Sequence, residues 1–338
     1  MTTVPAPKES SAKITAEQPT IHSVQPVNAR SRTPVYLGTR RFLGRRDLVV
    51  SFYTQKCQFK CSYCALPMAS ANEPVSVDDL NAQIDYVFQS KRENLSRFQQ
   101  LSFGNEGSVL DRRRFHRESL HRLLDHTNSM EDLSVLSLET RPEYVRQATL
   151  ADVIARTNAD VVEVTVGFET QDDHLRQVIL QKNISRRVME DRIKLLGELG
   201  VRLTSYVLVK PGPGMTEDAG VREAVATVEY LADLCNDAGV VFTAYLNPTY
   251  VAKGSLLEQS SELGLYTPPK IQSVFRVLVA SQRQGIPTYV GLWSEDLAGP
   301  NGDYRGYDDF DPGLRSAILE FNRTGDFNHL ASFVDELA

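Results

Sequence analysis

Short runs of β-branched and aromatic residues alternate with longer amphipathic stretches along most of the chain. Between the runs, polar and apolar positions follow a helical period, as in VSVDDLNAQIDYVFQSKR (75–92) and in RRVMEDRIKLLGEL, whose start Ser185 can cap. The runs predict buried strands at 47–54, 98–104, 133–139, 160–169, 203–209, 240–247 and, as a seventh candidate, 287–292. This alternation predicts an α/β fold with a parallel sheet and right-handed crossovers.

The number of strand–helix units favours a barrel, because the chain carries no glycine-rich dinucleotide fingerprint that would indicate a Rossmann sheet. We expect a partial (β/α)6 barrel over residues 35–292 and a short C-terminal loop and helical cap over 293–338. Residues 1–34 are rich in Pro, Ser, Thr and Gln without periodicity and predict a disordered N-terminal tail. In a barrel, chemistry belongs at the carboxyl ends of the strands.

Six arginines lie between Arg30 and Arg46, directly before the first predicted strand. Two interpretations stay open for this segment: a solvated approach to the barrel, or a contact for phosphate or RNA. The net charge of the 338-residue chain is −6, which disfavours a protein that coats nucleic acid or membrane by charge alone.

The absence of targeting signals and the small number of cysteines limit the cellular compartments in which we expect the protein. No apolar run approaches the ~18 residues that a membrane span needs, and the N-terminus lacks the apolar core of a signal peptide. Four cysteines are too few for a disulfide framework. We therefore expect a cytoplasmic protein in a reducing compartment, without a membrane partner.

Three of the four cysteines lie in CQFKCSYC, residues 57–64. Cys57, Cys61 and Cys64 follow the first predicted strand, which places them on the first βα loop at the catalytic rim. The spacing lets the loop wrap three thiolates around one face of an iron–sulfur cube and leaves one iron without a protein ligand. A structural zinc site would need a distant fourth ligand. Cys235 falls on the apolar stripe of a helix and is expected to be a buried core thiol.

The CQFKCSYC segment resembles the signature of the radical S-adenosylmethionine (SAM) enzymes, with Tyr63 at the aromatic position before the last cysteine. The resemblance implies a partial radical SAM barrel, one 4Fe–4S cluster on the three cysteines, and SAM bound to the open iron. It further implies an electron donor such as flavodoxin or ferredoxin. The reduced cluster would then cleave SAM to methionine and a 5′-deoxyadenosyl radical, which abstracts hydrogen from the substrate.

The same resemblance assigns SAM contacts to the ends of the next strands. The segment after the second strand stands at the place of the superfamily's Gly-Gly-Glu motif, which suits an ammonium group because carbonyls and a carboxylate accept from it. Glu139 stands where a related acid binds the SAM ribose. For Glu169 two roles stay possible, a contact with SAM or substrate and a salt bridge at the rim. The residues assigned to SAM besides Tyr63 are Gly104, Asn105, Glu106, Glu139, Glu169 and Arg176.

The later strands supply the candidates for substrate contact. Lys210 precedes a rigid Pro-Gly-Pro-Gly turn, and Tyr245 and Asn247 end the sixth predicted strand. We interpret these three residues as catalytic, with structural capping of the rim as the alternative. For Arg141 two roles stay possible, a contact with a ligand carboxylate and a structural cap of the rim.

Residues 135–275 are similar to the elongator-like radical SAM group and resemble most the radical SAM subunit of archaeosine synthase. The sequence predicts a radical SAM enzyme with a small-molecule substrate. The alternatives are modification of a transfer RNA nucleoside and a non-catalytic iron–sulfur protein. A basic face would favour RNA if the arginines of 40–46 and 112–117 converged beside the barrel mouth, whereas scattered or acid-paired arginines would favour the small molecule. The oligomeric state stays open.

Overall fold

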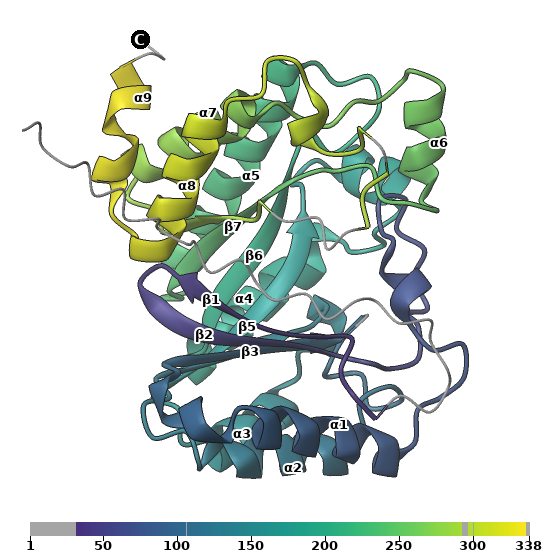
Figure 1. Ribbon diagram of the computed structural model, residues 1–338, viewed down its shortest axis with the longest axis vertical. Coiled ribbons are helices and arrows are strands. Elements are labelled where there is room, and N and C mark those ends of the chain that lie inside the picture. Colours follow the sequence, from purple (N-terminus) through teal and green to yellow (C-terminus); the bar gives the residue numbers. More distant parts are fainter. Residues whose placement is uncertain (1–31, 106, 293–296, 300, 336–338) are drawn as a thin grey trace, which may run out of the picture.

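A computed structural model describes residues 32–105, 107–292, 297–299 and 301–335. Residues 1–31 of the predicted N-terminal tail lie outside the described residues, as do 293–296, 300 and 336–338 of the predicted C-terminal segment. A curled eight-stranded sheet runs in chain order from the first strand to the last (Figure 1). The strands are β1 Tyr36–Phe42, β2 Arg45–Phe52, β3 Gln100–Asn105, β4 Val135–Glu139, β5 Val161–Glu169, β6 Arg202–Val209, β7 Phe242–Pro248 and β8 Thr288–Val290.

Strand β1 pairs antiparallel with β2, and every later pair of neighbours is parallel. The helices cover the outer face of the curl, with α1, α2 and α3 packed under β2 and β3 and with α5, α7 and α8 over the other half (Figure 1). They are α1 Val77–Ser90, α2 Arg117–Thr127, α3 Gln147–Arg156, α4 Arg186–Leu199, α5 Glu217–Asp237, α6 Leu256–Glu262, α7 Ile271–Arg283, α8 Pro312–Thr324 and α9 Ala331–Asp335.

The predicted α/β half-barrel is therefore confirmed, and all seven predicted strands are present as β2 to β8. Local chemistry explains several helix starts: the side chains of Ser76, Ser185 and Thr216 each accept a hydrogen bond from a backbone N–H in the first turn. Within the described part of the chain, no helix has the combination of length and apolar composition that would carry it across a bilayer.

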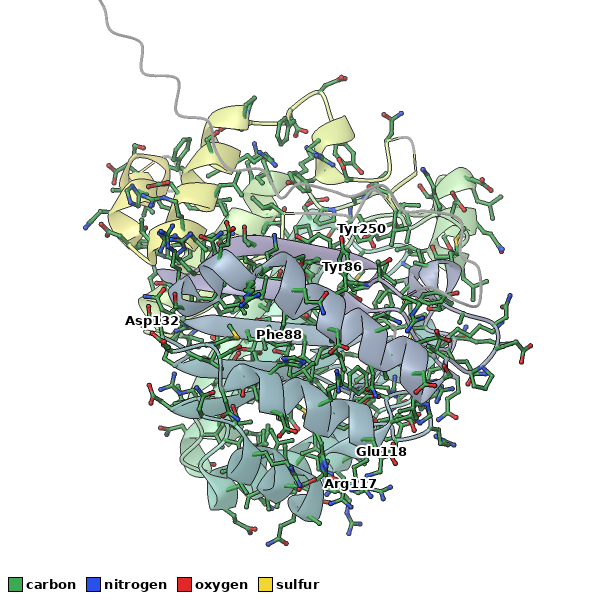
Figure 2. All side chains as sticks on the ribbon, turned by 60° about the horizontal axis from the view of Figure 1, so that its bottom comes forward. Tyr86, Phe88, Arg117, Glu118, Asp132 and Tyr250 are labelled. Carbon is green, nitrogen blue, oxygen red and sulfur yellow. The ribbon has the colours of Figure 1, made fainter. Side chains whose placement is uncertain are left out.

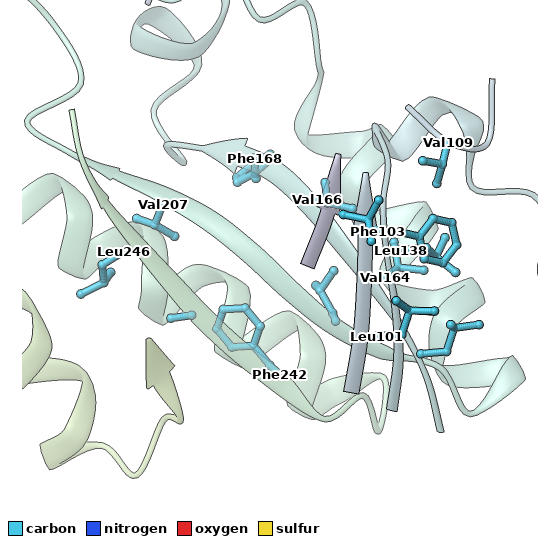
Figure 3. Packing of buried hydrophobic residues seen from close by; sticks show 14 of the residues in the cluster. Leu101, Phe103, Val109, Leu138, Val164, Val166, Phe168, Val207, Phe242 and Leu246 are labelled. Carbon is cyan, nitrogen blue, oxygen red and sulfur yellow. The ribbon is translucent and has the colours of Figure 1, made fainter. Parts of the chain in front are cut away.

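The core lies between the sheet and its helices, and it is built by strict alternation along the strands. In β5, Val162, Val164, Val166 and Phe168 are buried on the helix side, whereas the residues between them line the inside of the curl. Figure 3 shows this packing for β3 to β7. The thiol of Cys235 is buried in the same core, as predicted, and burial raises its pKa to about 12.

The arginine-rich segment is an exception to the prediction, because most of it forms β1 and the turn into β2. Leu43 and Gly44 both have positive φ, as a two-residue hairpin turn requires, and they pair Phe42 with Arg45. Arg40 and Phe42 consequently point into the barrel. Arg40 is thus part of the barrel interior, whereas Arg32 and Arg41 of the same segment are exposed.

Helix α8 closes the gap between the two edge strands at the amino end of the barrel. The backbone N–H of Leu43 donates to the carbonyl of Asn322, 2.9 Å away. The side chain of Asn322 accepts from the N–H of Val290 at 3.0 Å and donates to its carbonyl at 2.7 Å. One buried asparagine therefore joins the β1–β2 hairpin to β8.

Replacing Asn322 by Ala should lower the free energy of unfolding by about 1–3 kcal/mol, since it leaves both polar groups of Val290 unpaired in the core. Urea unfolding followed by circular dichroism measures this change. The exposed Asn328→Ala in the following turn is the matched control and should change stability by less than about 0.5 kcal/mol. Equal effects of the two variants would contradict this role for Asn322.

Candidate active site

A cavity of about 360 Å³ opens at the carboxyl ends of the parallel strands and continues into the lumen of the curled sheet. Figure 2 labels Tyr250, one of its lining residues, on the loop that follows β7. The cysteine loop forms one wall, and strand ends form the others. The sequence-predicted residues that line this cavity are Cys57, Cys61, Tyr63, Cys64, Gly104, Asn105, Glu139, Glu169, Tyr245 and Asn247.

Two predicted site residues lie elsewhere. The ammonium of Lys210 forms an ion pair with Glu217 at 2.7 Å and donates to the hydroxyl of Thr267 at 3.1 Å. Because Glu217 is the first residue of α5, this pair connects the end of β6 to that helix. The guanidinium of Arg176 is fully buried and donates to the carbonyls of Thr170 and Ile184. Neither side chain is part of the described cavity wall. Glu106 lies outside the described residues.

The cysteine loop, residues 57–64, is fastened to the loop that follows β5. Ser62 donates through its backbone N–H to the carbonyl of Leu180 at 3.0 Å and through its hydroxyl to the carbonyl of Ile179 at 2.8 Å. On the other side Gly107 packs closely, because a Cβ there would lie 3.4 Å from the sulfur of Cys57. These contacts turn three half-buried thiols toward one cavity.

The cysteine loop carries three thiols, the ligand type that iron–sulfur clusters use. Among the described residues, no three His, Cys, Asp or Glu side chains gather as ligands of one metal ion. An iron–sulfur cube instead binds each cysteine at a different iron, so its ligands are spread over one face. Three separate thiols on one cavity wall match that requirement.

A buried lysine that the sequence reasoning missed stands beside this loop. Lys182 forms an ion pair with Glu169 at 2.7 Å, and its ammonium also donates to the hydroxyl of Tyr63 at 3.0 Å. The Tyr63 hydroxyl in turn donates to the same Glu169 oxygen at 2.7 Å. Lys182 follows no strand directly, and the only local signal is Asn183, a residue type that tolerates the left-handed backbone found there.

Burial and charge act against each other in this group. Burial alone would lower the pKa of Lys182, but the charges of Glu169 and Cys61 together with the hydrogen bond to Glu169 outweigh burial and raise that pKa. Burial raises the pKa of the Tyr63 hydroxyl well above its usual value, and Glu169 adds to the effect. Lys182 is therefore charged and Tyr63 neutral at physiological pH.

The rim also presents polar groups that lack a partner within the described part of the chain. The side-chain oxygen of Asn105 and the Nε of Arg141 are both buried and unpaired, and both residues line the cavity. A free acceptor and a free donor are what the ammonium and carboxylate groups of an amino acid require. Glu139 stands between them in chain order, and its carboxylate accepts from the hydroxyl of Tyr206 at 3.0 Å.

Deeper in the lumen the lining is polar rather than packed with aliphatic side chains. Buried Asp47 accepts from Arg40 at 2.7 Å and from the hydroxyl of Ser102 at 3.0 Å. The Arg40 guanidinium lies over the ring of Phe42, 4.8 Å from its centroid. The other lumen side chains are Gln100, Ser137, Glu163, Thr165 and Thr204.

The chain matches no family model. It is 24% identical over 246 residues to an uncharacterized protein of Methanocaldococcus jannaschii, covering 71% of this chain and 65% of that protein. It is also 24% identical over 237 residues to archaeosine synthase subunit beta of Methanosarcina acetivorans, covering 69% and 66%. The chain thus spans just under two thirds of the length of these relatives.

Two solved structures share the fold. Elp3 of the archaeon Methanocaldococcus infernus, lacking residues 1–46, matches with a TM-score of 0.52 at 13% identity over 73% of this chain and 59% of that chain. SuiB of Streptococcus suis bound to S-adenosylmethionine matches with a TM-score of 0.50 at 11% identity over 80% and 56%.

The half-barrel agrees with the fold that the cysteine motif predicts, because Elp3 and SuiB bound to S-adenosylmethionine share it. The sequence relatives include archaeosine synthase subunit beta, which residues 135–275 resemble. The comparisons support the expectation of an enzyme and leave its reaction type open.

Burial raises the pKa of the Glu163 carboxyl above its ordinary value of 4.5. The folded state then binds this proton more tightly than the unfolded state, so the stabilisation is complete below pH 4.5 and is lost as pH rises through the folded pKa. Glu163→Gln cannot lose a proton. Its free energy of unfolding should therefore rise relative to wild type as the pH increases from 4 to 8.

Urea unfolding at a series of pH values measures this difference. Exposed Glu131→Gln is the control for a carboxylate outside the barrel. A constant difference between Glu163→Gln and wild type across the pH range would contradict the raised pKa.

Proposed function

We propose that the protein is a radical SAM enzyme that binds one 4Fe–4S cluster through Cys57, Cys61 and Cys64 and acts on a small-molecule substrate, such as a natural product or an amino-acid derivative. The observation that carries this proposal is the shared cavity: the three cysteines of one short loop line the same space as Asn105 and Arg141, and each of these two residues keeps one buried polar atom without a partner among the described residues.

The cluster with SAM would supply one-electron chemistry that removes hydrogen from an unactivated carbon. The chain's own residues hold and orient the SAM. Asn105 accepts from its ammonium, Arg141 donates to its carboxylate, and Glu139 accepts from a ribose hydroxyl. Gly104 allows this approach, because a Cβ there would lie 3.1 Å from the Glu139 carboxylate. An electron donor such as flavodoxin or ferredoxin and a cytoplasmic location are part of the proposal.

The arginines favour a small molecule over RNA. Arg40 lies inside the barrel with Asp47, and Arg45 donates to Gln100 at the amino end, away from the rim. Arg117 pairs with Asp152 on the helix layer, where Figure 2 shows it far from the cavity residue Tyr250. Arg113 and Arg114 share the single carboxylate of Asp111, which offsets one of their two charges, and Arg112 donates to the hydroxyl of Thr149. Most of the arginines thus scatter over the molecule instead of converging on the cavity.

The alternative function is radical modification of a transfer RNA nucleoside. The likeness to archaeosine synthase subunit beta favours it, at 24–25% identity over 68–69% of this chain. A non-catalytic iron–sulfur protein is the weakest candidate, because it gives no reason for unpaired polar groups at the rim beside the cysteines.

Cys61→Ala should abolish both cluster uptake and SAM cleavage, because two thiolates cannot hold the cluster on this loop. After anaerobic reconstitution, iron and sulfide content and the formation of 5′-deoxyadenosine under a strong reductant measure the two effects. Cys235→Ala is the matched control: it removes a thiol from the hydrophobic core and should keep wild-type iron content and cleavage. Full cleavage by Cys61→Ala would overturn the proposed function.

Deuterium transfer separates the two substrate classes. The reconstituted enzyme is incubated with the small-molecule fraction of a fully deuterated cell extract, or with transfer RNA purified from the same cells. We expect deuterium to enter 5′-deoxyadenosine only with the small-molecule fraction, as mass spectrometry would show. Enrichment only with transfer RNA would favour the alternative.

A further inference from the structure

Each interval between the cysteines contains one aromatic residue, and a buried cationic side chain contacts each of these aromatic residues. Phe59 lies between Cys57 and Cys61, and the guanidinium of Arg141 stands 3.5 Å from its ring centroid. Tyr63 lies between Cys61 and Cys64, and its hydroxyl accepts from Lys182 at 3.0 Å. Both intervals of the loop are thus fixed from the protein interior.

The two cations belong to one connected group. Arg141 donates to the backbone carbonyl of Lys182 at 2.8 Å, and Lys182 is in turn paired with Glu169. Because Glu169 also accepts from Tyr63, the group ties together the loops that follow β2, β4 and β5. We call these five residues the cation clamp: Phe59, Tyr63, Arg141, Glu169 and Lys182.

The backbone around the clamp is strained. Glu169 has φ +76°, and Gln181 and Asn183, on either side of Lys182, have φ +52° and +55°. Side chains other than glycine adopt such angles at an energetic cost, and they persist where the surroundings enforce them, typically at functional sites. These residues pair with Lys182 or flank it in the chain, and the ammonium of Lys182 contacts Tyr63 in the cysteine loop.

The space around the ion pair is equally restricted. A Cβ on Gly167 would lie 2.7 Å from the ammonium of Lys182 and nearer still to the carboxylate of Glu169. Glycine is therefore required there for the pair to fit. Since a buried ion pair brings little net stability compared with apolar packing, stability alone does not account for this arrangement.

We propose that Lys182 is a positioning residue that, through the cation clamp, holds the cysteine loop in its metal-binding shape before any metal arrives. This inference rests on the proposed function only in taking the loop as the cluster site. The clamp limits the conformations of the loop, so the three thiols face the cavity already in the apoprotein. Metal binding then costs less conformational entropy than it would in a chain whose cysteine loop were mobile.

Lys182→Met keeps the aliphatic stem and removes the ammonium. Hydrogen exchange of the full-length apoprotein, read by mass spectrometry on peptides covering 57–64, should be at least tenfold faster in this variant, because the loop opens more often. Tyr63→Phe removes only the bridging hydroxyl and should give a smaller acceleration. Lys182→Arg keeps a charged donor and should restore much of the protection.

Lys210→Met is the matched control. It also breaks a lysine–glutamate pair of 2.7 Å, formed by a buried lysine with positive φ and a half-buried glutamate, but outside the cavity wall. It should lower the midpoint of thermal unfolding without accelerating exchange in 57–64. If it accelerated exchange there as much as Lys182→Met, the effect would be general destabilisation and the inference would fall.

A second readout uses the reconstituted protein. Iron loss to an excess of chelator should be at least tenfold faster from Lys182→Met than from wild type and unchanged in Lys210→Met. Unchanged loop exchange in Lys182→Met would overturn the clamp even if cluster uptake in wild type were normal. Absence of cluster uptake in wild type would instead overturn the proposed function, while the exchange measurement still decides whether the clamp orders the loop.

Discussion

Parallel strand direction is the constraint on which the rest of the structure depends. From β2 to β8 every neighbouring pair is parallel, so seven carboxyl ends meet at one rim. Because side chains alternate between the two faces, residues as distant in the chain as Ser51 and Gly291 come to line one cavity. The cysteine loop needs only to follow the first parallel strand to face all the others.

Glycines and small polar side chains contribute to the open lumen of the curl, beside large side chains such as Phe42, Tyr206 and Tyr245. Gly104, Gly167 and Gly291 remove side chains at the rim, and a Cβ on Gly291 would lie 2.6 Å from the ring of Tyr245. Hydroxyl groups on β3 to β6 line the level below, where a closed barrel would carry branched aliphatic side chains. The polar lining is stabilised by internal pairs such as Arg40 with Asp47, so the space is available to a ligand without exposing core residues.

Local patterns sufficed for the seven parallel strands β2 to β8, the capped helix start at Ser185 and the position of the cysteine loop, since each depends on neighbours in sequence, but they did not predict β1. Local patterns failed where tertiary contacts determine the position of a side chain. The strand-end rule placed Lys210 at the cavity, but its backbone turns at φ +58° and its ammonium meets Glu217 on α5 instead. Lys182 escaped notice because it lies in a loop thirteen residues beyond its partner Glu169, and no periodicity connects them. Arg40 lies inward through hairpin pairing that its charge gave no reason to expect.

The ends of β5 and β6 show how one local design produces two outcomes. Strand β5 ends in Glu169, and Lys210 directly follows β6. Both residues have positive φ, and each forms a lysine–glutamate ion pair of 2.7 Å. At the end of β6 the partner is Glu217, on the first turn of the following helix, and the pair joins sheet to helix. On β5 a register shift between Gly167 and Glu169 accompanies the turn, and the partner Lys182 comes from a loop that touches the cysteines. The same ion pair is therefore structural in one place and part of the site in the other, and the difference lies in which loop supplies the second charge.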